Sequence, residues 1–244
     1  MNEPPEHRDR YCIVGSGPSG VCAARWLGEL GVPFDVLERQ RDVGGIWDIS
    51  APGSPMYESC HFISSKTLSG FHSDPMPSDY PDYPRHGLVL DYLKNYADRH
   101  GLRQHIEFGV SVEHAMPTAD AWRVTLGSGE TRSYAGVIAS VGNEWRASRP
   151  DIPGRFEGSV IHSSEYESPE SLTGKRVLVV GGGNSGCDLA ADAATHARSA
   201  AISLRRGYHF VPKYILGQPT DVFAAGSAML PAWIKQPMFE MLLR

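Results

Sequence analysis

The chain has 244 residues, of which 41% are hydrophobic and 21% are charged, and its formal net charge is −5. This composition is ordinary for a globular protein, and the acidic balance gives no support to a nucleic-acid-binding surface. The polar N-terminus contains no apolar signal-peptide core, and the apolar stretch over residues 222–234 is too short to span a bilayer. We therefore expect a disordered tail over residues 1–9, no transmembrane segment and a cytoplasmic location.

A glycine fingerprint lies between the first predicted strand and the first predicted helix. Residues 10–14 are near-continuously apolar, as in a buried parallel strand, and residues 18–30 have the spacing of an amphipathic helix. In G-x-G-x-x-G the first glycine allows a tight turn, the second lets a pyrophosphate approach the backbone, and the third lets helix and strand pack closely. The helix N-terminus then presents N–H groups to the phosphates. The predicted cofactor-binding residues are Gly15, Ser16, Gly17, Pro18, Ser19 and Gly20, and the predicted buried helix face is Val21, Ala24, Leu27 and Leu30.

An acidic residue ends the second predicted strand, which covers residues 33–38. Glu38 stands 18 positions after Gly20, where a carboxylate hydrogen-bonds the ribose hydroxyls and rejects a 2′-phosphate by its charge. The first site should therefore hold FAD or NAD and not NADP, with Glu38 and the following Arg39 as binding residues. The glycine pair and aromatic that come next suit either a loop pressed against the cofactor or a turn with a core tryptophan. The candidates there are Gly45, Ile46 and Trp47.

The middle of the chain is predicted to be irregular and then rich in β-strands. Residues 48–84 show no periodicity, and their aromatic side chains favour a functional loop over a disordered one. A helix is predicted over residues 88–100, with Leu90, Leu93, Tyr96 and Ala97 on its buried face and Gly101 at its end. Short strands at residues 106–112, 122–126 and 133–141 predict an antiparallel meander inserted into the first domain, and Pro150, Pro153 and Gly154 mark a linker.

A second fingerprint repeats the strand–turn–helix pattern. A strand over residues 176–180 leads into the turn, a helix is predicted over residues 184–196, and the next strand covers residues 200–204. That strand is followed by two arginines instead of an acid, and paired guanidiniums suit a 2′-phosphate. The second nucleotide is therefore predicted to be NADPH, bound by Gly181, Gly183, Asn184, Ser185, Gly186, Arg205 and Arg206. Two fingerprints in this context predict an α/β fold with two dinucleotide-binding, Rossmann-like domains.

The segment between the fingerprints resembles a family signature. The spacing F-x-G-x-x-x-H-x-x-x-Y is met by Phe156, Gly158, His162 and Tyr166, and it is similar to the signature of flavin-containing monooxygenases. The related Baeyer–Villiger monooxygenases carry Trp at the last position, so Tyr166 resembles the N- and S-oxygenating branch. The loop at residues 45–47, the proline-rich segment at 76–83 and the turn at 183–188 also resemble that family, so that the resemblance covers nearly the whole chain.

This resemblance implies an enzyme with FAD, NADPH and O₂ as its reaction partners. NADPH would reduce the flavin, and a flavin hydroperoxide would oxygenate a small molecule with a soft nitrogen or sulfur nucleophile. It also implies an FAD-binding domain over residues 1–154, a linker carrying the signature over 155–174, and a partial NADPH-binding domain over 175–244. His162 and Tyr166 are then positioning residues near the NADPH site and not a nucleophile and base.

Two departures from the family pattern stand out. The family usually carries an amide donor near the flavin, and counting from Tyr57 and Lys66 places Ile63 at that position. Members are also roughly twice this long, so the chain is expected to lack the final flavin-binding strand and much of the second sheet.

Three alternatives to an N- or S-oxygenating enzyme stay open. A Baeyer–Villiger-type monooxygenase is one. Another FAD/NAD(P)H oxidoreductase, such as a disulfide reductase, shares both fingerprints but needs a redox dithiol. No C-x-x-C and no metal-ligand spacing exists among Cys12, Cys22, Cys60 and Cys187. A truncated, non-catalytic nucleotide-binding fragment is the third. The sequence names neither the substrate nor the oligomeric state.

Overall fold

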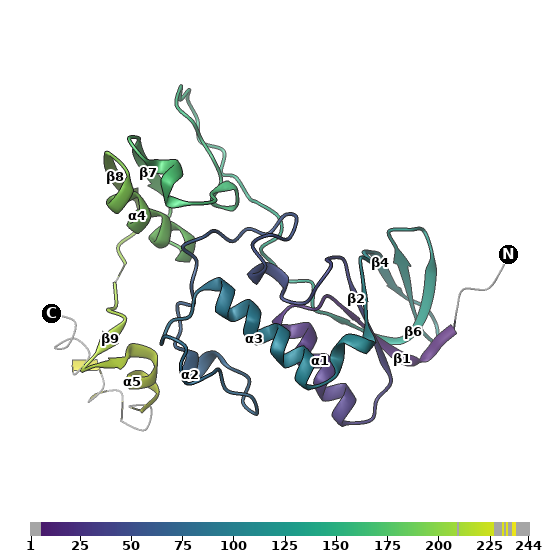
Figure 1. Cartoon of the computed structure of the whole chain (residues 1–244). Helices are drawn as coiled ribbons and strands as arrows, with labels where there is room; N and C mark the ends of the chain where they lie inside the picture. The colour runs from purple at the N-terminus through teal and green to yellow at the C-terminus, as the bar shows by residue number, and fades with distance from the viewer. Residues whose placement is uncertain (1–5, 209, 227–230, 232, 234–235, 238–244) are drawn as a thin grey trace. The chain divides into compact units, whose positions relative to one another are not determined.

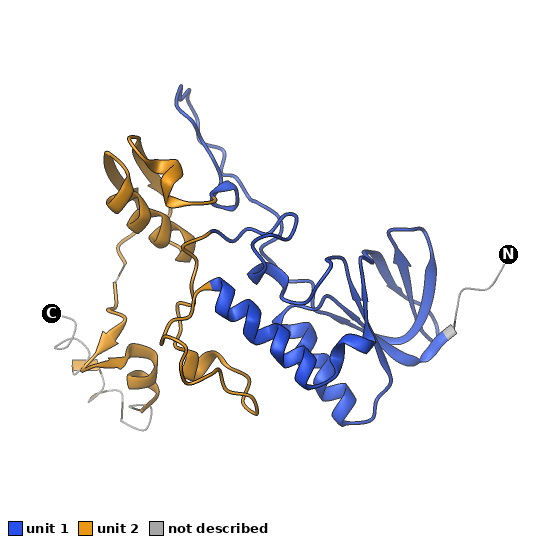
Figure 2. Ribbon diagram, viewed as in Figure 1, with its two compact units in different colours: residues 1–57, 86–166 blue, residues 58–85, 167–244 orange. Residues whose placement is uncertain are grey.

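The computed structural model describes residues 6–208, 210–226, 231, 233 and 236–237. It has a mixed α/β fold, as predicted, and divides into two compact units. Unit 1 comprises residues 1–57 and 86–166, and unit 2 comprises residues 58–85 and 167–244 (Figure 2). The predicted domain boundaries differ from this division mainly at residues 58–85, which group with unit 2.

A six-stranded sheet forms the centre of unit 1. Its strand order is β3-β2-β1-β6-β5-β4. The pairs β3–β2, β2–β1 and β1–β6 are parallel, whereas β6–β5 and β5–β4 are antiparallel. The strands are β1 (Glu6–Val14), β2 (Phe34–Glu38), β3 (Ile106–Phe108), β4 (Val112–Pro117), β5 (Trp122–Leu126) and β6 (Thr131–Ala139).

Two predictions for these strands were wrong. Residues 6–9 do not belong to a disordered tail, because β1 begins at Glu6 and pairs with β6 from Ser133. Residues 1–5 of that predicted tail lie outside the described residues. The segment at 106–108 is not part of the meander, because it pairs in parallel with β2. The antiparallel meander is instead β4, β5 and β6, and β6 continues into the parallel part of the sheet beside β1.

Helices α1 (Pro18–Glu29) and α3 (His86–Arg99) pack against each other in unit 1 (Figure 1). Gly101, in the left-handed region at φ 61°, follows α3 and precedes the 3₁₀-helix η2 (Leu102–His105). Three predicted face residues are not buried as expected: Leu30 is 71% exposed, and Leu27 and Leu90 are only half-buried. The buried residues of α3 are Val89, Tyr92, Leu93, Tyr96 and Ala97.

The core of unit 1 combines the parallel strands with the meander. Buried residues of β1 and β2 pack with those of β5 and β6, in a cluster of Cys12, Leu37, Val124, Leu126 and Tyr134. Alternation along the strands, as in the buried Val124 and Leu126 of β5, directs these side chains to one face. This core holds β1 and β2 in parallel register, so that their carboxyl ends lie level with each other.

Unit 2 contains a small parallel sheet, β7 (Arg176–Val180) and β8 (Ser199–Ser203), connected by α4 (Asn184–His196). The bounds of β7 and α4 agree with the prediction, and β8 begins one residue earlier. Leu178 and Val180 are 63% and 61% exposed, so one face of β7 is apolar and open. The remaining elements are α2 (Lys66–Ser69), η4 (Pro169–Leu172), β9 (Tyr214–Ile215), β10 (Gln218–Pro219) and α5 (Thr220–Gly226).

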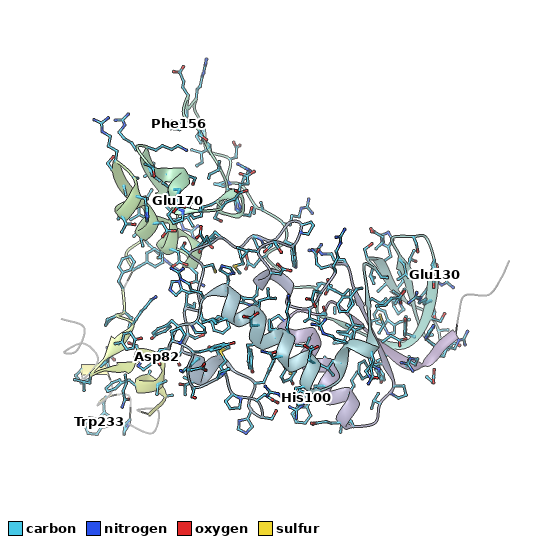
Figure 3. All side chains as sticks on the ribbon, in the orientation of Figure 1. Asp82, His100, Glu130, Phe156, Glu170 and Trp233 are labelled. Atoms are coloured by element: carbon cyan, nitrogen blue, oxygen red, sulfur yellow. The ribbon has the colours of Figure 1, made fainter. Side chains whose placement is uncertain are left out.

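Residues 58–85 join unit 2 through specific polar contacts. The backbone N–H of Ser65 donates to Oδ2 of Asp221 at 2.6 Å. The Tyr83 hydroxyl donates to the carbonyl oxygen of Lys213 at 2.5 Å, and Asp82, labelled in Figure 3, accepts from the Tyr214 hydroxyl at 3.1 Å. This segment is irregular, as predicted, apart from the short helix α2. In the part of the chain that the structure describes, no helix is both long and apolar enough to cross a membrane.

Candidate functional site

The first fingerprint forms a tight turn between β1 and α1. Gly15 has φ +99°, and a Cβ there would lie 2.5 Å from the carbonyl oxygen of Ser140. At Gly20 a Cβ would lie 1.9 Å from the carbonyl oxygen of Gly15, which shows why only glycine fits. Gly17 differs, because its φ is −69° and its Cβ would meet Gly45 Cα at 3.5 Å, an ordinary contact. The protein's own packing therefore does not require glycine at position 17, and a glycine there fits the close approach of a pyrophosphate.

The N-terminus of α1 has the features of an anion-binding site. Pro18 is the first helical residue and Gly17 is the N-cap, so no N-cap side chain occupies the helix's free N–H groups. Together with the positive end of the helix dipole, this arrangement favours a phosphate at the turn.

Glu38 at the end of β2 braces this turn. The side chain is 5% exposed. Its Oε2 accepts from the backbone N–H of Ser16 at 2.6 Å and from the Ser16 hydroxyl at 2.8 Å, and Oε1 accepts from the N–H of Gln40 at 2.8 Å. The carboxylate therefore lies beside the phosphate turn, at the predicted ribose position, and also orders the backbone on both sides of it.

The glycine pair after β2 packs against the fingerprint turn. The 3₁₀-helix η1 (Gly45–Trp47) begins there, and Gly44 and Gly45 have φ values of 130° and 60°. A Cβ at Gly45 would lie 3.0 Å from Gly17 Cα, and the Gly44 N–H donates to the carbonyl oxygen of Ser16 at 3.2 Å. Of the two interpretations, the packing favours a loop pressed against the cofactor turn, because Ile46 and Trp47 are only half-buried and not core residues.

Asp42 attaches this loop to α3 and η2 through two ion pairs. Its Oδ1 accepts from Arg103 at 2.7 Å, and Oδ2 lies 2.9 Å from Lys94 Nζ on α3. Burial acts to raise the pKa of Asp42, but these two cations hold it below its usual value. The sequence analysis missed this residue, since an acid in a loop has no distinguishing pattern.

The second fingerprint repeats the geometry of the first within unit 2. Gly181 has φ +111°, a Cβ at Gly186 would lie 2.3 Å from the carbonyl oxygen of Gly181, and nothing lies within 4 Å of a Cβ at Gly183. Gly183 is the N-cap of α4, again without a side-chain cap, and Asn184 and Ser185 are the first helical residues. The same division of roles among three glycines therefore recurs, with open space at the second glycine.

Two exposed arginines follow β8, as predicted. The Gly181 N–H donates to the carbonyl oxygen of Ser203 at 2.9 Å, which places the carboxyl end of β8 beside the turn. Arg205 and Arg206 come directly after this end and are both exposed, and the Arg206 guanidinium lies 5.8 Å from the centre of the Tyr208 ring. The matching bond in unit 1 runs from the Gly15 N–H to the carbonyl oxygen of Leu37, so Leu204 corresponds to Glu38 and Arg205 corresponds to Arg39. Unit 2 therefore lacks the buried carboxylate of unit 1 and has two cations directly after that position.

The signature residues have local structural roles in unit 1. Phe156, labelled in Figure 3, is 74% exposed, and a Cβ at Gly158 would lie 2.5 Å from its ring. Nδ1 of His162 accepts from the Ser164 N–H at 3.2 Å and so caps the 3₁₀-helix η3 (Ser163–Glu165). Tyr166 is 2% exposed and makes an edge contact with Tyr57, ring centres 5.5 Å apart.

The family model for flavin-binding monooxygenase-like proteins matches residues 8–241. The chain belongs to the flavin-binding monooxygenase-like family. This confirms the family that the sequence motifs indicated and the flavin that gives the family its name.

Three relatives show the range of this flavin-binding monooxygenase-like family. A probable indole-3-pyruvate monooxygenase of Arabidopsis thaliana, YUCCA9, is 36% identical over 91% of this chain and 53% of its own length. Flavin-containing monooxygenase 5 of Oryctolagus cuniculus is 33% identical over 81% of this chain and 40% of its own length. A crystal structure of cyclohexanone monooxygenase in the open form, 28% identical, has a TM-score of 0.69 and covers 84% of this chain and 41% of that one. The chain therefore spans about half the length of the curated relatives it matches.

The cysteines of this flavin-binding monooxygenase-like chain give no support to a disulfide reductase. In the part of the chain that the structure describes, Cys12, Cys22, Cys60 and Cys187 form no disulfide. Burial raises the pKa of Cys12 to about 12 and that of Cys60 to about 11. Both are therefore neutral thiols at physiological pH and poor nucleophiles.

Ile63 is 61% exposed, and the neighbouring Phe62 N–H donates to the carbonyl oxygen of Pro84 at 2.9 Å. An exposed isoleucine contributes little to packing, so its position leaves room for substitution without a large loss of stability.

Proposed function

We propose that unit 1 binds FAD at the first fingerprint and unit 2 binds NADPH at the second, as parts of a flavin-dependent monooxygenase that uses O₂ to oxygenate a soft nitrogen or sulfur nucleophile. The observation that carries this proposal is the repeated turn with contrasting charge after it. At the second glycine of both turns a Cβ would meet at most an ordinary contact. The strand of unit 1 ends in Glu38, whereas unit 2 has Leu204 at the matching position and then Arg205 and Arg206.

The residues of unit 1 are suited to hold FAD. The space at Gly17 and the start of α1 would receive the pyrophosphate, and Glu38 would accept hydrogen bonds from the adenosine ribose. Arg39 and the loop at Gly45, Ile46 and Trp47 would border the dinucleotide on the side of β2. When bound and reduced, the flavin supplies the oxygen-transfer chemistry, while the protein positions it and excludes water.

The residues of unit 2 are suited to hold NADPH. Gly183, Asn184 and Ser185 at the start of α4 would receive its pyrophosphate. Arg205 and Arg206 would pair with the 2′-phosphate, because guanidiniums form charge-assisted, bidentate bonds with phosphates. A carboxylate at this place would repel that phosphate, which is the reason to assign the coenzymes in this order.

We also propose the predicted domain roles in a cytoplasmic protein: an FAD domain over residues 1–154, a linker over 155–174 and an NADPH domain over 175–244. Residues 58–85 of the first of these group with unit 2 in the structure. His162 and Tyr166 would act in the linker as positioning residues. The cap of His162 on η3 and the buried contact of Tyr166 with Tyr57 support a role in fixing the linker.

A second candidate is oxygenation next to a carbonyl group, of the Baeyer–Villiger type. The names of two relatives favour it, since one is a probable indole-3-pyruvate monooxygenase and the other a cyclohexanone monooxygenase. Baeyer–Villiger enzymes carry Trp at the position that Tyr166 occupies in the signature. The tyrosine here therefore favours a nitrogen or sulfur nucleophile.

The proposal is tested by loading the chain with FAD, adding NADPH without oxygen and then admitting O₂ with a sulfide, an amine or a ketone. We expect loss of the flavin's visible absorbance with NADPH and oxygenation of the sulfide or amine. Oxygenation of only the ketone would favour the second candidate, and a flavin that NADPH does not reduce would contradict both. Because Ile63 replaces an amide donor, much of the consumed O₂ should appear as peroxide, and Ile63→Asn should lower that fraction.

A further inference from the structure

A planar cation and an aromatic ring face each other beside the first fingerprint. The guanidinium carbon of Arg39 lies 4.0 Å from the centre of the Trp145 ring. This is a van der Waals contact distance, and Arg is the cation that most often lies over aromatic faces. Trp145 is half-buried, whereas its neighbours Glu144 and Arg146 are exposed.

The two residues come from loops on opposite sides of β1. Arg39 directly follows β2, and Trp145 lies in the loop after β6; both strands are parallel neighbours of β1. Val14, the last residue of β1, pairs with Leu37 on one side and with Ala139 on the other. Both loops therefore leave the sheet at its carboxyl end, where a dinucleotide binds in this class of fold, and the Arg39–Trp145 contact spans the end of β1.

The contact lies next to the predicted ribose position. Glu38 immediately precedes Arg39 and is fixed to the turn through Ser16. The backbone on the other side is also fixed, because the Val110 N–H donates to the carbonyl oxygen of Glu38 at 2.9 Å. A base attached to a ribose at Glu38 would therefore lie within reach of the Arg39–Trp145 pair.

We propose that Arg39 and Trp145 form a clamp for the adenine ring of FAD. In this structure the clamp is closed, because the two side chains contact each other. Adenine would enter between the two planes, stacking on the indole on one face and on the guanidinium on the other. The planes would then separate by one further stacking distance, about 3.5 Å. Gly142, with φ +70°, precedes Trp145 in the loop. The conformational freedom of glycine would let the backbone turn there when Trp145 moves away from Arg39.

This inference rests on the proposed binding of FAD by unit 1, and it is tested with a probe that has no flavin. ADP carries the adenine, ribose and pyrophosphate alone. We expect ADP to change the tryptophan fluorescence of the full chain, and the change to become smaller in Trp145→Phe, which lacks the stacking indole but keeps Trp47 beside the turn. The change should disappear in Gly17→Ala, which assigns it to the first fingerprint and not to the second.

The binding constants separate stacking from other roles. Trp145→Ala should weaken ADP and FAD at the first fingerprint about tenfold, equivalent to about 1.4 kcal/mol, while Trp145→Phe, which keeps an aromatic face, should weaken FAD less than threefold. Arg39→Ala should also weaken FAD. Trp26→Ala is the matched control, because Trp26 is 54% exposed and lies 5.8 Å from the Arg25 guanidinium in the same unit. It should leave FAD affinity unchanged.

The outcomes distinguish the clamp from the FAD site itself. If Gly17→Ala abolishes FAD binding but Trp145→Ala binds FAD and ADP like the wild type, the clamp is wrong and the proposed FAD site stands. If the wild-type chain binds neither FAD nor ADP at the first fingerprint, both are wrong. If Trp145→Ala and Trp26→Ala weaken FAD equally, the loss is a general effect on stability and the clamp is again contradicted.

Discussion

Glu38 and Ser16 are joined by two hydrogen bonds to one carboxylate oxygen, from the backbone N–H at 2.6 Å and from the hydroxyl at 2.8 Å. The residue predicted to hold a ribose therefore also holds the phosphate-binding turn in place. Binding and stability should thus be coupled at this position, because the same carboxylate serves both.

Replacing Glu38 tests this coupling. Glu38→Ala leaves the buried N–H and hydroxyl of Ser16 without their acceptor, and a hydrogen bond to a charged group contributes about 1.5–3 kcal/mol. We expect the free energy of unfolding to fall by about 2 kcal/mol without any ligand, and FAD affinity to fall as well. Glu29→Ala is the control, since Glu29 makes an exposed ion pair with Arg25 and should cost less than about 1 kcal/mol. Equal losses in the two variants would contradict the role of Glu38 in the turn.

The three glycines of the first fingerprint should respond differently to alanine. At Gly17 the added methyl group meets only an ordinary contact at 3.5 Å, so Gly17→Ala should cost less than about 1 kcal/mol of stability but release FAD. At Gly20 it would lie 1.9 Å from a backbone oxygen, so Gly20→Ala should cost about 3 kcal/mol or more. Thermal unfolding and the flavin content of the purified variants measure both effects. FAD retained by Gly17→Ala would rule out a pyrophosphate at that turn.

Coenzyme choice should depend on Arg205 and Arg206. Replacing both with Ala removes charge-assisted bonds of about 1.5–3 kcal/mol each, so NADPH should bind at least about tenfold more weakly, while NADH should change little. Arg198→Ala is a matched control, because Arg198 is exposed and adjoins the opposite end of β8. Titration with the two coenzymes is the measurement, and equal losses for NADPH and NADH would contradict the 2′-phosphate role.

The anchor of the glycine loop should be sensitive to acid. Although burial acts to raise the pKa of Asp42, Lys94 and Arg103 hold it below its usual value. A lowered folded-state pKa means that the carboxylate stabilises the fold above the ordinary carboxyl pKa of about 4. That stability is then lost as the pH falls through the folded-state pKa.

Asp42→Asn should therefore cost about 1 kcal/mol at neutral pH and much less at about pH 3. Urea unfolding of wild type and variant at the two pH values measures this difference. A cost that does not depend on pH would show that the charge of Asp42 is not what anchors the loop.

Local sequence rules predicted the parts of the fold in which neighbouring residues decide the structure. The two turns follow from glycines whose positions allow no Cβ, and the helices that begin at Pro18 and Asn184 follow from those turns. The pairing of strands that are far apart in the sequence was not predicted. The strand Ile106–Phe108 is too short for its sequence to indicate whether it pairs with β2 or with the meander. Residues 58–85 were assigned by chain order, but contacts such as Ser65 with Asp221 bring them into unit 2.

The same distinction holds for the candidate site. Gly15, Gly17 and Glu38 could be found because their spacing is itself the signal. Asp42 and Trp145 could not, because each acquires its role from partners far away in the sequence. The partners of Asp42 are Lys94 and Arg103, and the partner of Trp145 is Arg39, on the other side of β1. An aromatic residue in a loop after a strand of the sheet was the one available sign of Trp145.

The central claim is that the chain has two separate dinucleotide sites, one for FAD in unit 1 and one for NADPH in unit 2. Equilibrium binding of both ligands to the wild type, Gly17→Ala and Gly183→Ala tests it most directly, because neither added methyl group would clash with the protein and neither change should disturb the fold. Because the Cβ of Gly17→Ala would make only an ordinary contact and that of Gly183→Ala none within 4 Å, the account predicts one FAD and one NADPH per wild-type chain, loss of FAD alone in Gly17→Ala and loss of NADPH alone in Gly183→Ala. Competition of FAD and NADPH for a single site, or loss of both ligands in either variant with the fold intact, would contradict it.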